Sequence, residues 1–171
     1  MLAAFAFAAE NSGVPATAPA DFQAGVFMGY NGTDLRTAMN ACFLPDQKIA
    51  DDTDAFIAAI EAHDWSTVMG TIKGDEPAAL EDADKCINDP AYVDVYDAYH
   101  AQQDNVEAAM ADPDWQIKAG KALLPHRAEI KTNIKEATTQ WNAGNYYEAG
   151  IAVGKIDAIV FAPWEKKAFL Q

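Results

Sequence analysis

The sequence predicts an all-α protein, and three observations carry this prediction. Alanine, the strongest helix former, occupies 35 of the 171 positions. Apolar residues recur at helical spacing, and no stretch alternates with period two over the length of a strand. Glycines and prolines divide the chain into segments of helical length. We therefore expect a compact antiparallel helical bundle of about six or seven helices.

The first 20 residues are expected to differ from the rest of the chain. Residues 1–9 form an apolar arm and residues 10–20 a linker containing Pro15 and Pro19, so residues 21–171 make up a single helical domain. The arm resembles the end of a secretory signal, an apolar run followed by small residues, although it lacks basic residues. It is either a cleaved signal or an ordered arm that is buried on a neighbouring molecule.

In the first two thirds of the domain, we expect a helix over residues 21–30, a break at 31–33 and a second helical segment that reaches Phe43. The next helix starts at a cluster of acidic side chains that suits the helix dipole, Asp51, Asp52 and Asp54. Further helices are predicted over 65–74, from 75 through Cys86, and from 89 to about 111. The last of these carries an apolar stripe.

In the final third, a helix over residues 115–124 precedes a second one that begins at Pro125. In that second helix, four apolar residues face the core, Ile130, Ile134, Ala137 and Trp141, while Arg127, Lys131 and Lys135 form a basic row along its flank. Gly144 is expected to end this helix and Asn145 to cap the last one, which ends at Pro163.

A glycine pattern near each end of the chain predicts how two of the helices pack. Gly25 and Gly29 lie in the first predicted helix, and Gly150 and Gly154 lie in the last, each pair four residues apart and with similar neighbours. Residues four apart share one face of a helix. Because glycine inside a helix costs stability, we expect both glycine faces to serve a close approach of the first and last helices.

Charge is divided unevenly along the chain, whose net charge is −14. Residues 1–111 contain 4 Lys/Arg and 19 Asp/Glu, whereas residues 112–171 contain 8 Lys/Arg and 7 Asp/Glu. Such a chain should repel nucleic acids and anionic membranes, and no stretch is long and apolar enough for a membrane span. The division indicates either a well-hydrated acidic surface or an acidic face that meets a less acidic face of a second copy.

The two cysteines, Cys42 and Cys86, are expected to form a disulfide if the chain is secreted. Closing a loop of about 45 residues contributes roughly 4 kcal/mol in the chain-entropy description. The alternative is a pair of buried free thiols. If the chain is secreted, Asn31 can also be glycosylated, because Asn31-Gly32-Thr33 is an N-glycosylation sequon at a predicted break between helices.

No residue pattern predicts catalysis, a metal site or a cofactor. The three histidines, His63, His100 and His126, are scattered and have no paired ligand spacing. The acidic clusters at 51–54 and 112–114 lack the glycine and glutamate of a calcium loop. The aromatic residues allow one alternative, an apolar ligand cavity lined by Tyr92, Tyr96, Tyr99, Trp65, Trp115 and Trp141, although at helical spacing such residues are typical of a core.

Several of these residues form a series that resembles a known group of proteins. The series is Phe22-x-x-Gly25-x-x-x-Gly29-Tyr30, a cysteine about a dozen residues later, a helix with Cys86, and Tyr147-x-x-Gly150-x-x-x-Gly154. It is similar to small secreted helical proteins of microbial eukaryotes such as ciliates. The resemblance spans roughly residues 21–160. It implies secretion and a disulfide-pinned helical domain, and it implies no catalytic residue.

Together these features predict a secreted, non-enzymatic structural protein that self-associates through its N-terminal arm, as in an extracellular fibre. An arm that docks on the next subunit makes a heterologous contact, and heterologous contacts that do not close give filaments. Two alternatives remain. One is a monomeric carrier of an apolar small molecule or lipid, and the other is an acidic subunit of a hetero-complex.

Overall fold

The structure is a computed structural model that describes residues 13–64, 67, 92–94, 97, 104–105, 107–109 and 111–164. Within these residues all regular structure is helical, with six α-helices and two short 3₁₀-helices, so the prediction of an all-α fold is confirmed. The N-terminal arm and the helices predicted over 65–74 and from 75 through Cys86 lie outside the described residues, as does most of the long helix predicted after them.

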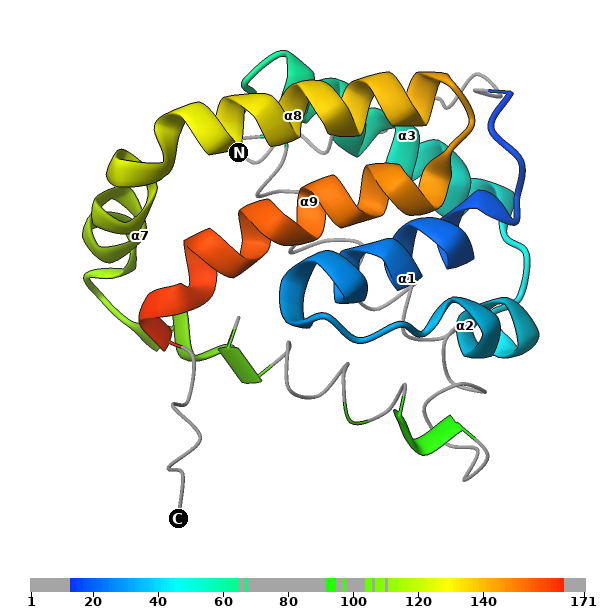
Figure 1. The fold of residues 1–171 in the computed structure, drawn as a ribbon, viewed down its shortest axis with the longest axis horizontal. Coiled ribbons are helices and arrows are strands. Elements are labelled where there is room, and N and C mark those ends of the chain that lie inside the picture. Colours follow the sequence, from blue (N-terminus) through cyan, green and yellow to red (C-terminus); the bar gives the residue numbers. More distant parts are fainter. Residues whose placement is uncertain are drawn as a thin grey trace, which may run out of the picture.

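The helices pack in layers around a central pair (Figure 1). In chain order they are α1 (Ala18–Asn31), α2 (Arg36–Cys42), α3 (Gln47–Glu61), α7 (Trp115–Leu123), α8 (Arg127–Asn142) and α9 (Tyr146–Phe161), with 3₁₀-helices at Leu124–His126 and Ala162–Trp164. The central pair is α1 and α9. Helix α8 packs on α9, α3 packs on α8, and α2 packs on α1.

Helix α1 begins at Ala18, three residues earlier than expected, so the predicted linker over residues 10–20 is wrong at its end. Pro19 occupies one of the first two helical positions, where its missing N–H is not needed and its fixed φ suits the helix. Ala18 and Ala20 are buried in the core. The preceding residues are held as well, because Gln47 Nε2 donates to the carbonyl of Val14 at 3.0 Å. From the sequence alone Pro19 is assigned to the linker, because proline is typical of linkers as well as of helix starts.

Helix α3 also begins earlier than expected, at Gln47 rather than at the acidic cluster. Asp46 is its N-cap, and its side chain accepts a hydrogen bond from the backbone N–H of Ile49 at 3.0 Å. This bond satisfies one of the unpaired donors at the helix start. The acidic residues over 51–54 consequently lie beyond the first turn, where the positive end of the helix dipole does not reach them.

The relative direction of the central pair differs from the expected antiparallel arrangement. Gly25 faces Tyr147 and Gly150, and Gly29 faces Ile151, so residue numbers increase in the same direction along both helices. Helices α1 and α9 therefore run parallel, whereas α8 and α9 form an antiparallel hairpin (Figure 1). A short connection forces only sequential helices to reverse direction. The long chain between α1 and α9 imposes no such constraint.

The connection between α8 and α9 is short because Gly144 adopts the left-handed conformation, with φ of +78°. A residue with a Cβ is strained there, and glycine ends α8 as predicted. Asn145 precedes α9, but its side chain makes no cap hydrogen bond and instead donates to Gln140 Oε1 at 2.8 Å. The predicted position of this residue is correct and its predicted cap bond is wrong.

Backbone contact between α1 and α9 depends on the four glycines that the repeated pattern singled out. A Cβ added to Gly25, Gly29, Gly150 or Gly154 would lie less than 3.0 Å from a backbone carbonyl oxygen of the facing helix, closer than real Cβ atoms approach such an oxygen. In each glycine, a hydrogen atom stands where other residues have Cβ, and it points toward the facing carbonyl oxygen. This is the geometry of a weak Cα–H···O contact. The two helices therefore touch through their backbones.

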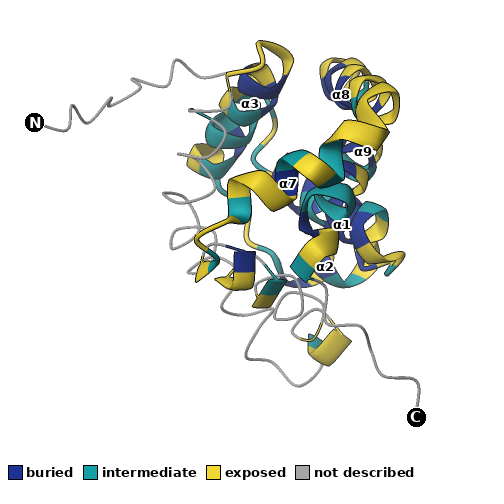
Figure 2. Cartoon of the chain, turned by 90° about the vertical axis from the view of Figure 1, so that its left-hand side faces the viewer, coloured by how far each residue is buried: buried dark blue, intermediate teal, exposed yellow. Residues whose placement is uncertain are grey.

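The main core gathers on both sides of this helix pair. One cluster joins α1, α3, α8 and α9 around Phe22, Ile57, Ile134 and Trp141. A second joins the other side of α1 to α2 through Phe27, Leu35, Met39 and Cys42. Figure 2 shows buried residues on the inward faces of these helices. Among the described residues, no helix is both long and apolar enough to cross a membrane.

Replacing Gly150 with alanine is expected to destabilise the protein by about 3 kcal/mol or more, because its Cβ would meet the carbonyl oxygen of Phe22 and the helices would have to separate. The control is Gly120→Ala in α7, where no atom lies within 4 Å of the added Cβ. That change should stabilise the helix by up to about 1 kcal/mol. Urea unfolding of both variants tests this, and equal stabilities would contradict the backbone contact.

Candidate functional site

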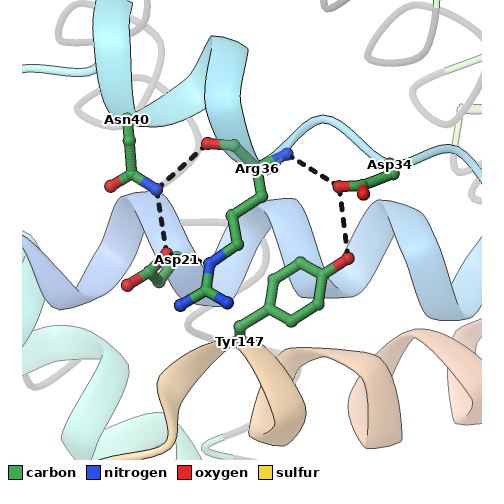
Figure 3. A network of polar contacts seen from close by, with 5 residues as sticks. All are labelled: Asp21, Asp34, Arg36, Asn40 and Tyr147. Carbon is green, nitrogen blue, oxygen red and sulfur yellow. Dashed lines mark hydrogen bonds and ion pairs between the residues drawn. The ribbon is translucent and has the colours of Figure 1, made fainter.

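The most extensive group of polar contacts among the described residues joins α1, α2 and α9 at one end of the central pair (Figure 3). Arg36 Nε lies 2.9 Å from Asp21 Oδ1, and Asn40 Nδ2 donates to the same oxygen at 2.9 Å. Tyr147 donates its hydroxyl proton to Asp34 Oδ1 at 3.3 Å. We call these five residues the polar clamp.

Arg36 is the centre of the polar clamp. Its guanidinium carbon lies 4.7 Å from the centre of the Tyr147 ring, a cation–π distance, while its backbone N–H donates to Asp34 Oδ1 at 3.2 Å. One arginine thus contacts side chains from α1, from the α1–α2 connection and from α9. The hydrogen bond to Asp21 raises the pKa of Arg36 above its ordinary value, so the guanidinium stays charged.

The polar clamp holds three helices together. Burial, followed by the charge of Asp34, raises the pKa of Tyr147, so its hydroxyl remains a proton donor at neutral pH. The carboxylates of Asp21 and Asp34 already accept hydrogen bonds from the clamp's own residues. The arrangement positions α2 against the end of the glycine contact between α1 and α9.

A second polar group closes the other end of the domain. Asp112 accepts from the backbone N–H of Asp114 at 2.9 Å and from Trp164 Nε1 at 3.0 Å, and it pairs with Lys118. These hydrogen bonds, led by the one from Lys118, lower the pKa of Asp112 to about 2. This carboxylate ties the start of α7 to the 3₁₀-helix after α9, and it remains ionised in all but strongly acidic solution.

The candidate ligands for calcium and other metals do not converge. Asp51 accepts from Gln47 Nε2 at 2.9 Å, Asp52 pairs with Lys48, and Asp54 accepts from Trp141 Nε1 at 2.6 Å. Each carboxylate of the 51–54 cluster therefore has a different partner. No group of three or more His, Cys, Asp or Glu residues that could hold a metal ion occurs among the described residues.

The histidines are also apart from one another. His63 follows α3 with a positive φ of 57°, and His126 Nδ1 lies 3.0 Å from Glu129 Oε2 on the outer surface. His100 lies outside the described residues.

Several of the described aromatic residues pack in the core clusters. The Trp141 ring stands edge-on to Phe22 and Tyr146, with ring centres 5.4 Å and 4.8 Å away, and its indole N–H is bonded to Asp54. Tyr92 packs against the second core cluster, on the far side of α1. Trp65, Tyr96 and Tyr99, which the carrier alternative also requires, lie outside the described residues.

Two residues predicted from the sequence have positions that suit modification. Asn31 is exposed at the last position of α1, where its side-chain oxygen accepts the backbone N–H of Thr33 at 3.0 Å, so the whole sequon lies at the surface. Cys42 is buried at the end of α2, with its Sγ 3.9 Å from the carbonyl oxygen of Met39. Its predicted partner, Cys86, lies outside the described residues.

Sequence reasoning missed the polar clamp, and no sequence signal could have found it. Its members lie on α1, α2 and α9, and Tyr147 is 113 residues from Asp34. The contacts exist only because the glycine faces place α9 beside α1. Sequence reasoning also missed Asp157, a residue of α9 whose carboxyl is buried and has no hydrogen-bond or ion-pair partner in the described part of the chain.

Comparison of the chain with protein-family models, curated proteins and solved structures gave no match.

Asp157 generates a prediction about pH, because burial raises the pKa of its carboxyl to about 7. The folded protein then binds a proton more tightly than the unfolded chain, so this group's contribution to stability falls as the pH rises from about 4 through 7. Asp157→Asn should increase the free energy of unfolding at pH 8 by on the order of 1–3 kcal/mol and change it little at pH 4.

Thermal and urea unfolding at both pH values measure this difference. Glu136→Gln, which neutralises an exposed carboxylate of α8, is the control and should show no such dependence. An equal gain from Asp157→Asn at pH 4 and pH 8 would contradict the assignment.

Proposed function

We propose that this chain is a secreted, non-enzymatic structural protein that self-associates, as a subunit of an extracellular fibre. The observation that carries the proposal is the division of charge, with an excess of 15 acidic residues over residues 1–111 and a nearly balanced remainder. Two copies can place unlike regions in contact, and a contact between different surfaces gives a filament when its rotation does not close into a ring.

The helix packing supports a structural role. Within the described residues, the polar clamp, the Asp112 group and the glycine contact each join elements that are distant in sequence, and their polar atoms are used in these contacts. Contacts of this kind at both ends of the domain suit a subunit that repeats in an assembly. The likeness to small secreted proteins of ciliate type supports secretion and a disulfide-pinned helical domain.

Secretion is supported by the signal-like residues 1–9, by the exposed sequon at Asn31 and by the cysteine pair. We include in the proposal a disulfide between Cys42 and Cys86, which would pin α2 to a region far along the sequence. A buried cysteine at a helix end is suited to such a bridge, because its position is fixed by the surrounding core.

The self-association is tested by measuring the solution mass of the full-length, oxidised chain with size-exclusion chromatography and light scattering. We expect a mass far above 18.5 kDa, the mass of one chain. Removing residues 1–12 should abolish the assembly and leave the helical circular dichroism unchanged, if the arm makes the contact. A full-length chain that remains a monomer would overturn the proposal and favour the carrier of an apolar ligand.

The truncation must stop before residue 13, because Val14 packs on the core and Ala18 and Ala20 are buried in α1. A deletion of all 20 residues would remove part of the folded domain, and a loss of assembly would then have no clear meaning.

The two modifications are tested by one intact-mass measurement on chain secreted from eukaryotic cells. Reduction should add the mass of two hydrogen atoms, and Asn31→Gln should remove a glycan. Reduction should also lower the free energy of unfolding by roughly 4 kcal/mol, the entropy of a loop of about 45 residues. A mass that neither treatment changes would count against secretion.

A further inference from the structure

One surface of the domain, along α7 and α8, carries cations that make no ion pair with another described residue, although the protein as a whole is strongly acidic. The surface follows α7, the 3₁₀-helix after it and α8, and consists of Ile117, Lys121, Leu124, Arg127, Lys131 and Lys135, all of them exposed. We call it the α7–α8 stripe. None of its four cations makes an ion pair with a described residue.

The spacing of these residues aligns them along the helices. Ile117, Lys121 and Leu124 are four and three residues apart, and Arg127, Lys131 and Lys135 are each four apart, so each set shares one helix face. Like charges four residues apart weaken an isolated helix. Two acidic residues of α8, Glu129 and Glu136, lie outside this row. The stripe therefore gathers positive charge at a cost to the helix itself.

The stripe also exposes apolar side chains. Ile117 is 59% and Leu124 is 61% exposed, the two most exposed large hydrophobic residues of the described part of the chain. Burying both on a partner would contribute apolar area, while the cations would select a partner surface that is acidic.

The chain itself carries such a surface on its opposite edge. The described parts of residues 92–111 lie at the edge of the domain remote from α8 (Figure 1, green segments at the bottom and α8 at the top). Their charged residues are all acidic and exposed, Asp94, Asp97, Asp104 and Glu107. The basic row of α8 and these acidic residues therefore lie on segments that are remote from each other.

We infer that the α7–α8 stripe of one molecule docks the acidic edge of a second copy, the surface that carries Asp94, Asp97, Asp104 and Glu107. Because these two surfaces differ, the contact is head-to-tail and leaves one of each open on the pair for further copies. This inference rests on the proposed self-association and adds a second contact to the one proposed for the N-terminal arm. Anionic polymers and membranes are disfavoured as occupants, because the net charge of −14 repels them.

Salt should act on this contact in two opposite ways. At low ionic strength the net charges of the copies repel one another over a long range. At about 0.15 M salt the Debye length falls to about 8 Å, so the net repulsion is screened while charges in direct contact still attract. Assembly should therefore be strongest near physiological salt and weaker at about 1 M salt.

The experiment reverses charge on each edge separately and then combines the products. Variant one is Lys131→Glu with Lys135→Glu on the stripe, and variant two is Asp94→Lys with Asp97→Lys on the acidic edge. In sedimentation velocity at about 0.15 M salt, each variant alone should associate at least tenfold more weakly than the unaltered chain. Mixed in equal amounts, they should assemble again, because each then offers the other a complementary edge.

The matched control is Lys48→Glu with Lys155→Glu, two exposed lysines away from the stripe whose reversal changes the net charge as variant one does. The control should associate more strongly than variant one and closer to the unaltered chain. Circular dichroism should be the same for all variants. Recovery in the mixture excludes misfolding as the cause of the losses.

The outcomes separate this inference from the proposed function. If the unaltered chain assembles and the edge variants assemble equally well, or if the control is lost as fully as variant one, the docking surfaces are wrong and self-association stands. If the unaltered chain stays a monomer in every salt, self-association itself fails. A monomer that pellets with phosphatidylserine vesicles through Lys131 and Lys135 would replace the second copy with a membrane surface.

Discussion

The contact on which the rest of the structure depends is the approach of α1 to α9 through four glycines. A carbonyl oxygen of the facing helix occupies the place where each Cβ would be, so the helix axes lie closer than any side chain would allow. Packing at this distance brings the neighbouring residues of both helices into contact along their length. The main core and the polar clamp are arranged around the pair that results, and both lose their geometry if the helices separate.

The polar clamp shows how a surface group can depend on a backbone contact. Exposed ion pairs contribute little by themselves, because water competes for both charges. Here the Arg36 side chain contacts the Asp21 carboxylate and the face of the Tyr147 ring. Its backbone carbonyl also accepts a hydrogen bond from Asn40 Nδ2. The value of the arrangement lies in its geometry, since it fixes α2 relative to both α1 and α9. That fixes the position of Cys42 in turn.

The charge that is divided unevenly along the sequence is also separated in space. The described acidic residues of 92–111 lie on segments remote from α8, the helix that carries the basic row (Figure 1). Helix packing keeps these two groups of charge apart within one molecule. A second copy can bring them together, which is how helix packing and the proposed assembly are connected.

The sequence by itself determined the fold class, the glycine faces and the inward row Ile134, Ala137 and Trp141, because these depend on residue type and on helical spacing. It misplaced the starts of α1 and α3, where Pro19 and Asp46 act as local start signals that resemble linker and turn residues. Only the tertiary structure decided that α1 and α9 run parallel and that Asp21, Arg36 and Tyr147 meet. The contacts that α9 makes with α1 and with Asp34 and Arg36 join residues more than a hundred positions apart, and no local pattern encodes which distant side chains a helix will meet once its faces are buried.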